Sequence, residues 1–159
     1  MKSLRPTESG FTLAELLVVV AVMGILAAIA VPSFRSLSQA QQVKNASFEL
    51  FTNLALARSE AIKRNGNVTL TPADTADWGK GWTIASTTGT IETIRSQAAL
   101  KGVSIAATGA PASVAYARTG RATAAATFQI DVAGTATANI RCLKIDLSGM
   151  PRTIKGACT

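Results

Sequence analysis

A long apolar run near the start of the chain constrains its fold more than any other feature. Between Glu8 and Arg35 the only ionisable side chain is Glu15, which stands directly before this run. As a helix, residues 11–34 would be about 36 Å long, enough to cross the hydrocarbon core of a bilayer. A carboxylate in such a segment costs roughly 2.5–3.5 kcal/mol on insertion, so it normally has a partner. Nothing in the same segment supplies one, and we expect it to come from a neighbouring copy of a similar helix.

The residues that introduce the apolar run follow a specific order. A short basic leader ends in Gly10, and the next residues read Phe11, Thr12, Leu, Ala and Glu15. This order resembles the N-terminus of type IV pilins and of the pseudopilins of type II secretion. The resemblance implies that a prepilin peptidase cuts between Gly10 and Phe11 and methylates the new amino group. It also implies that Glu15 of an incoming subunit pairs with the terminal amine of a subunit already in the filament. Thr12 would add a hydroxyl hydrogen bond nearby.

The basic leader predicts the orientation of the chain. Because basic flanks stay on the cytoplasmic side, we expect everything after about Arg35 to be periplasmic. A secretory signal carries its apolar region before the cleavage site and loses it, whereas here the apolar region follows the candidate site and would be kept. We therefore expect a single-pass inner-membrane protein that later enters a pilus or pseudopilus. Pro32 stands where pilins commonly have a proline that kinks the helix.

The helical pattern continues beyond the apolar run. Apolar residues recur near helical spacing from Phe34 to Ile62, and Asn65-Gly66 is a typical helix end. We expect one helix from about Phe11 to Arg64. The apolar stripe of its second half is predicted to pack on a sheet, and the alternative is a groove for a partner.

The rest of the sequence is typical of short antiparallel strands. β-prone runs alternate with glycine- and proline-containing turns at spacings that favour hairpins. The expected strands are 68–71, 82–86, 90–95, 103–106, 113–117, 126–132 and 139–145, with 122–138 forming loop and edge strand. The predicted fold class is α+β, a long N-terminal helix packed on a C-terminal antiparallel β-sheet head. The expected domains are a leader (1–10), a transmembrane and filament-core helix (11–34), its amphipathic continuation (35–65) and the head (66–159).

Composition argues against an enzyme. The 159 residues include no histidine, and no nucleophile elbow, phosphate-binding loop or metal-ligand cluster is present in the sequence. Cys142 and Cys158 are a poor zinc set without histidine. In an exported region, two cysteines favour a disulfide. We expect no catalysis, no metal and no cofactor.

Three further segments resemble the FimT/FimU/GspH group of minor pilins and pseudopilins. They are 57–62 (ARSEAI), 77–82 (DWGKGW) and the closing Gly149-Met150-Pro151-Arg152 with Cys158. The resemblance implies a structural subunit at or near the tip of a filament, with other pilins as partners. One possibility is a type IV pilus, which serves adhesion, twitching motility or DNA uptake. The other is the type II secretion pseudopilus. The cysteine pair and the Gly-x-Pro-Arg ending favour the pilus.

A net charge of +7 allows a third hypothesis, a pilus-borne DNA receptor. Basic residues on one face can bind phosphates without reading sequence, and the alternative is a solubilising basic surface. Some FimT-type pilins act in DNA uptake through Gly-Arg-x-Arg, but here Met150 replaces the first arginine, which counts against this function. Trp78 and Trp82 could stack on bases, although their setting between glycines favours buried rings. The candidate DNA-binding residues are Arg118, Arg121, Arg141, Lys144, Arg152 and Lys155.

Overall fold

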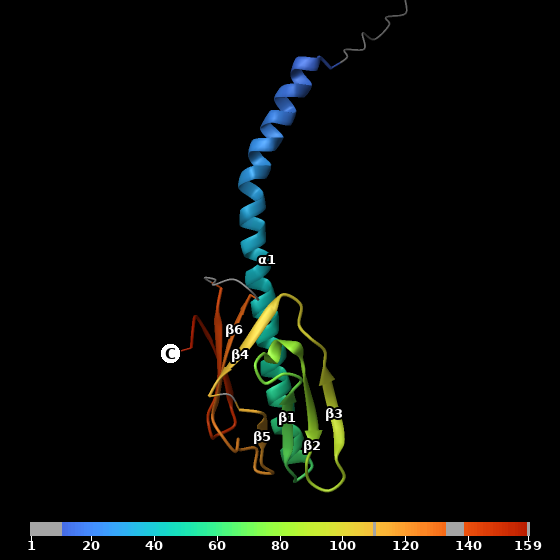
Figure 1. The fold of residues 1–159 in the computed structure, drawn as a ribbon, viewed down its shortest axis with the longest axis vertical. Coiled ribbons are helices and arrows are strands. Elements are labelled where there is room, and N and C mark those ends of the chain that lie inside the picture. Colours follow the sequence, from blue (N-terminus) through green and yellow to red (C-terminus); the bar gives the residue numbers. More distant parts are fainter. Residues whose placement is uncertain (1–10, 110, 133–138, 159) are drawn as a thin grey trace, which may run out of the picture. The chain divides into compact units, whose positions relative to one another are not determined.

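The computed structural model describes residues 11–109, 111–132 and 139–158. The chain divides into two compact units, Met1–Ser38 and Gln39–Thr159, which we call the N-terminal unit and the C-terminal unit. The long helix α1 (Leu13–Lys63) contributes to both (Figure 1). The leader expected at 1–10 lies outside the described residues.

The N-terminal unit presents its apolar side chains to its surroundings. Of the described residues, α1 holds one stretch that is long and apolar enough to cross a membrane, with a mean hydropathy of 2.7 and none of its residues buried. Glu15 lies in the first turn, and the helix continues through Pro32. Apolar exposure of this extent suits a segment surrounded by lipid or by other apolar helices. The kink at Pro32 stays a prediction.

In the C-terminal unit one face of α1 forms the centre of the core. The buried helix residues recur every three or four positions, as one face of an α-helix requires, and they pack against both sheets. This confirms that the apolar stripe packs on a sheet. Phe48 and Ile62 belong to the predicted stripe but stay exposed, because they lie beside this face. The buried apolar residues of α1 are Val43, Ala46, Leu50, Leu54, Ala57 and Ala61.

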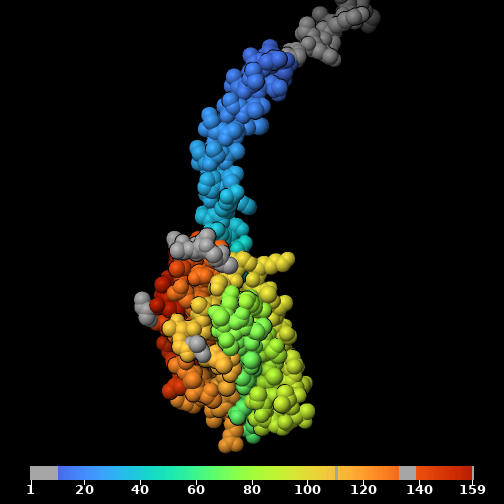
Figure 2. Space-filling view, viewed as in Figure 1, coloured from blue at the N-terminus to red at the C-terminus, as the bar shows by residue number. Residues whose placement is uncertain are grey.

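Two four-stranded antiparallel sheets complete the C-terminal unit (Figure 1). The first has the order β3 (Glu92–Gln97), β2 (Trp82–Ser86), β1 (Val68–Pro72), β5 (Val114–Tyr116). The second has the order β4 (Val103–Thr108), β6 (Ala126–Val132), β7 (Arg141–Ile145), β8 (Pro151–Lys155). In the space-filling view, the yellow-green β2–β3 region and the orange and red segments of the second sheet lie on opposite sides of this unit (Figure 2).

Two strand assignments differ from expectation. β6 was expected in a region of loop and edge strand, yet it lies between β4 and β7 and buries every second residue. The strand itself alternates clearly, with Phe128, Ile130 and Val132 buried, and the edge position was inferred from the alanine- and threonine-rich sequence around it. β8 was not predicted at all, because only its first residue, Pro151, is buried and the strand has no alternation to detect.

Between β1 and β2 a short 3-10 helix, η1 (Trp78–Lys80), carries the tryptophan motif into the core. Trp78 and Trp82 are both buried, and the Trp78 ring meets Phe128 edge to face at 4.9 Å between centroids. The Asp77 carboxylate accepts hydrogen bonds from the backbone N–H groups of Gly79 and Ile105, each at 2.8 Å. The motif therefore joins η1 to the edge of β4, and neither ring is free to stack on bases.

The two cysteines are joined. A disulfide connects Cys142 on β7 to Cys158, beyond β8, with Cα atoms 5.0 Å apart. The pairing expected from the sequence is therefore present, and it ties the C-terminal segment back to the second sheet. By closing a loop of this length it contributes about 3 kcal/mol in the chain-entropy model.

Candidate functional site

In the first turn of α1, Glu15 and Thr12 form hydrogen bonds with each other. The Glu15 N–H donates to Thr12 Oγ1 at 3.2 Å, and the Thr12 N–H and hydroxyl both donate to Glu15 Oε2 at 3.4 Å. This reciprocal arrangement is a capping box, which satisfies free N–H groups in the first helical turn. The helix dipole also favours a negative charge at this position. Thr-x-x-Glu is the sequence signal of such a box, and it predicts this contact directly.

The capping pair stands next to the expected processing site. Phe11 precedes Thr12 and is 79% exposed. Gly10 lies outside the described residues. Cleavage between Gly10 and Phe11 would create an amine one residue before the capping threonine. Such an amine and the Glu15 carboxylate would then occupy the same end of the helix, where a second helix can meet both.

Three segments far apart in the sequence meet around Arg58 in the C-terminal unit. Arg58 Nε donates to the backbone oxygen of Gly120 at 3.0 Å, and its Nη1 contacts the sulfur of Met150. Gly149 has φ +79°, and a Cβ at this position would lie 2.2 Å from the same Gly120 oxygen. Two of the segments that carry the family resemblance therefore fit against the β5–β6 turn. Sequence reasoning did not single out Arg58 or Gly120, because a bond from arginine to a distant backbone oxygen leaves no local pattern.

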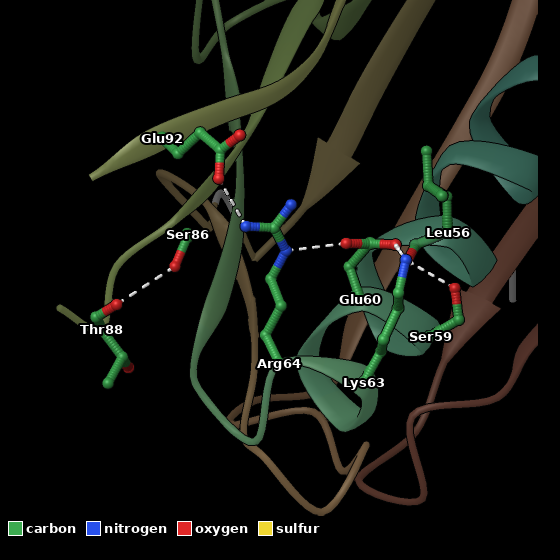
Figure 3. A network of polar contacts seen from close by, with 8 residues as sticks. All are labelled: Leu56, Ser59, Glu60, Lys63, Arg64, Ser86, Thr88 and Glu92. Carbon is green, nitrogen blue, oxygen red and sulfur yellow. Dashed lines mark hydrogen bonds and ion pairs between the residues drawn. The ribbon is translucent and has the colours of Figure 1, made fainter. Parts of the chain in front are cut away.

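The end of α1 is tied to β3 by an ionic network (Figure 3). Arg64 bridges Glu60 at 2.7 Å and Glu92 at 2.6 Å, and Lys63 lies 3.6 Å from Glu60. The hydrogen bond from Arg64 is the main reason that the pKa of Glu60 falls below its ordinary value. The bond with Glu60 is likewise the main reason that the pKa of Arg64 rises. The network closes the helix end onto the first sheet and has no feature of a binding site.

Four of the six basic candidates lie on β7 and β8, where they divide between the two faces of the second sheet, and Arg118 and Arg121 lie between β5 and β6. Arg141 stands opposite Lys155, and Lys144 stands opposite Arg152. Because successive side chains alternate between faces, these two pairs point to opposite sides. The described residues therefore place no more than part of the set on any one face.

The Lys144–Arg152 side of the sheet contains an acidic neighbour. Arg152 forms an ion pair with Asp146 at 3.3 Å. The pKa of Asp146 is lowered, chiefly by hydrogen bonds from Ser148 and to a smaller extent by the charges of Arg152 and Arg121. Arg118 is exposed in the turn before β6. Asp146 offsets part of the positive charge that a nucleic acid would need.

Comparison with known proteins identifies the family. Residues 46–149 match the model of the family described as type II transport protein GspH, which covers more than half of the chain. The chain belongs to the GspH family. Residues 5–31 also match the prokaryotic N-terminal methylation motif, the region that contains Gly10, Phe11 and Glu15.

Other members of the pilin superfamily share parts of this GspH-family chain. Two fimbrial proteins of Pseudomonas aeruginosa are 41% identical over 69 residues, which is 43% of this chain and 45% of theirs. Fimbrial protein EcpC of Eikenella corrodens is 38% identical over 81 residues, 51% of this chain and 50% of its own. The chain thus spans about half the length of the curated relatives it matches.

Solved structures show the same fold. The type IV minor pilin FimU of Pseudomonas aeruginosa aligns with a TM-score of 0.63 at 24% identity, over 70% of this chain and 87% of its own. The minor pseudopilin EpsH from the type 2 secretion system of Vibrio cholerae aligns with a TM-score of 0.59 at 17% identity, over 72% and 97%. The long helix with a C-terminal antiparallel sheet domain is therefore the pilin fold, as predicted.

Within the described residues, no group of three His, Cys, Asp or Glu side chains is placed to hold a metal ion. The polar clusters of the C-terminal unit are ion pairs and turn-closing hydrogen bonds. A further candidate surface is a pair of shallow apolar hollows along α1 and β8, which share Phe51.

Proposed function

We propose that this GspH-family chain is a minor subunit of a type IV pilus, cut between Gly10 and Phe11 and held in the inner membrane before assembly. The observation that carries the proposal is the first turn of α1. A single carboxylate, Glu15, is capped by Thr12 at the start of a long apolar stretch of helix in which no residue is buried. Such a helix is stable only in lipid or among other apolar helices.

Assembly follows from the cost of two charges in an apolar environment. Transfer of either the Phe11 amine or the Glu15 carboxylate alone into an apolar environment has a large unfavourable free energy. Within one helix the carboxylate has only the long hydrogen bonds from Thr12, at 3.4 Å. An amine supplied by a neighbouring subunit offers it a full charge partner. Pairing of Glu15 with the amine of the preceding subunit therefore favours insertion in register over random packing of apolar helices.

Several observations support a pilus over a pseudopilus. The curated relatives are fimbrial proteins, and the FimU structure aligns with a somewhat higher TM-score than EpsH. The second candidate is a minor pseudopilin of a type II secretion system. It is favoured by the family model itself, whose description is type II transport protein GspH. The DNA-receptor alternative has the least support, because its basic candidates divide between two faces.

The test is mass spectrometry of the N-terminus, comparing sheared surface filaments with the membrane fraction. We expect a peptide that begins at N-methylated Phe11 in both fractions. The processed peptide confined to membranes would favour the pseudopilus, whose filaments stay short. An intact Met1 terminus in both fractions would contradict the proposal. A gel shift at two salt concentrations tests the DNA alternative separately, since phosphate binding weakens steeply with salt.

A further inference from the structure

The two sheets end in strands β3, β5, β4 and β8, and these edges differ in how they are covered. Asp77 accepts the N–H of Ile105 and so covers β4. The loop after β5 folds back on it, with the Thr123 N–H donating to the Ala115 oxygen at 2.9 Å. Strand β3 is uncovered, but it is largely exposed on both faces, so a strand added there would bury little apolar surface. These three edges are poor templates for another chain.

Strand β8 directs outward backbone groups that have no hydrogen-bond partner among the described residues. The N–H of Gly156 donates to the oxygen of Ile140 at 2.8 Å, which makes these two residues a hydrogen-bonded pair continuous with the β7–β8 register. Such pairs alternate along antiparallel strands. Arg152 and Ile154 therefore direct their backbone groups toward β7, whereas Thr153 and Lys155 direct theirs to the open edge of the sheet.

An apolar groove runs beside this edge. One hollow of about 370 Å³ is lined by Phe48, Phe51 and Thr153, among others, and a second of about 250 Å³ by Phe51, Met150 and Pro151, among others. Phe48 is 64% exposed and Met150 51%. Pro151 and Thr153 stand opposite the buried Ile145 and Leu143, so they lie on the core-facing side of β8. A strand added to β8 would therefore place its core-facing side chains over this groove.

Positive charge marks one end of the groove. Lys44 and Arg141 line the larger hollow, and Lys155 stands opposite Arg141 on the same side of the sheet. Among the described residues, no acidic side chain lines either hollow. In the part of the chain that the structure describes, none of these three cations forms an ion pair with a carboxylate. The end of the groove therefore favours an anionic group.

We propose that the open edge of β8 is a docking site for an extended segment of another protein, which adds to the second sheet as a further strand. Alternate residues of a strand share one face. The segment therefore carries two apolar residues two positions apart, which cover Pro151 and Thr153. A carboxylate two positions before the first of these meets the cations. Backbone bonds to Thr153 and Lys155 supply affinity, while the groove and charges supply specificity. The site lies wholly within the C-terminal unit and does not depend on which filament the chain joins.

The first test uses a defined peptide and the full chain in detergent micelles. The probe is a labelled, end-blocked Thr-Glu-Thr-Val-Thr-Val-Thr peptide, in which the glutamate precedes the valines as an antiparallel strand beside β8 requires. Binding is followed by fluorescence anisotropy. We expect saturable binding that weakens at least tenfold when the glutamate of the peptide is replaced by lysine. In an extended peptide, successive backbone amides point to opposite edges. One further peptide is N-methylated on the amides of one edge, and a second is N-methylated on the amides of the other edge. One of these should retain binding and the other lose it, because strand addition uses a single edge.

The second test changes the protein. Thr153→Pro removes an outward N–H without breaking the β7–β8 ladder, and it should weaken peptide binding at least tenfold. Lys44→Glu should weaken binding similarly, whereas the matched Lys101→Glu, a charge reversal on the exposed turn before β4, should leave it unchanged.

Several results would overturn the proposal. These are no saturable binding of the parent peptide at millimolar concentration, equal binding of both N-methylated peptides, and a Thr153→Pro variant that folds and binds normally. A fourth result that would overturn it comes from analytical sedimentation of the full chain without peptide. If the chain associates with itself and Thr153→Pro abolishes this association, then a second copy of the chain, and not another protein, binds at the β8 edge.

Discussion

Arg58 of α1 and Gly120 of the β5–β6 turn are joined by a hydrogen bond of 3.0 Å, although 62 positions separate them in the sequence. The bond fixes the turn against the helix. Gly149 then packs against the same Gly120 oxygen, in a space that admits no Cβ. Helix, turn and the entry to β8 are therefore held by one arginine and two glycines.

Replacing Arg58 should test the importance of this corner. Arg58→Ala removes the donor and leaves the Gly120 oxygen without its partner, so we expect a loss of about 1–2 kcal/mol in the free energy of unfolding. Urea unfolding followed by tryptophan fluorescence measures it, because Trp78 and Trp82 are buried. Lys63→Ala, at an exposed position of the same helix, is the control. Equal losses in the two variants would contradict a specific role for Arg58.

Asp77 should be more important than Arg58 for stability, because one of its carboxylate oxygens accepts from two backbone donors. Asp77→Ala leaves the part-buried N–H groups of Gly79 and Ile105 without their acceptor, and we expect a loss of about 2–3 kcal/mol. Asp77→Asn keeps an oxygen acceptor at the same position and should lose clearly less. Chemical unfolding measures the free energy of unfolding of both variants. If Asp77→Asn loses as much as Asp77→Ala, then the negative charge, and not the presence of an acceptor, is what stabilises the fold.

Reducing the disulfide should weaken the second sheet specifically. Without the Cys142–Cys158 bond, we expect about 3 kcal/mol less stability. Amide hydrogen exchange should accelerate in β7 and β8 before it does so in β1 and β2. A Cys142→Ser/Cys158→Ser double variant should behave like the reduced protein. Uniform acceleration over both sheets would mean that the bond stabilises the whole unit and not its C-terminal end.

Glu15 should be required for assembly and not for membrane insertion. Glu15→Ala removes an expensive charge from an apolar helix, so membrane targeting should persist, while incorporation into filaments should fall at least tenfold. Immunoblots of membrane and sheared-filament fractions measure both quantities. Glu49→Ala, a change of the same kind in the C-terminal unit, should assemble normally. Normal incorporation of Glu15→Ala would refute the charge-pairing mechanism.

The Glu60–Arg64 bond should make stability depend on pH in acid. The pKa of Glu60 in the folded state lies below its ordinary value of 4.5. A lowered carboxyl pKa contributes stability that is present above the ordinary value and is lost as pH falls toward the folded value. Arg64→Met removes the main cause, so its stability should fall less steeply than that of the parent protein below about pH 5. Parallel thermal-unfolding profiles from pH 6 to 3 would contradict this.

Local patterns predicted most of the elements, and they failed where an element buries too few residues to show a period or where contacts join distant parts of the chain. The periodicity of α1 and the alternation of β1 and β2 are visible because each element buries a full face. β8 buries only Pro151, so its sequence resembles a loop. The capping box of Thr12 and Glu15 was not predicted as such, although its signal, Thr-x-x-Glu, is local because both partners lie within one helical turn.

The contacts of Arg58 were not readable, because they depend on which turn the folded sheets bring to the helix. The disulfide was expected because an exported chain with two cysteines has few other uses for them. The division of the basic residues between two faces required the β7–β8 register, and that register depends on a strand the sequence did not signal.

The corner formed by Arg58, Gly120 and Gly149 also has a consequence for the order in which the protein matures. A ribosome makes α1 well before the segments that contain Gly120 and Met150, so Arg58 cannot form its two contacts until those segments have been synthesised. Contacts between such distant positions slow folding, because a large loop must close before any of them forms. The C-terminal unit should therefore stay unfinished until these segments have been synthesised, which leaves a period in which chaperones and proteases can act on it.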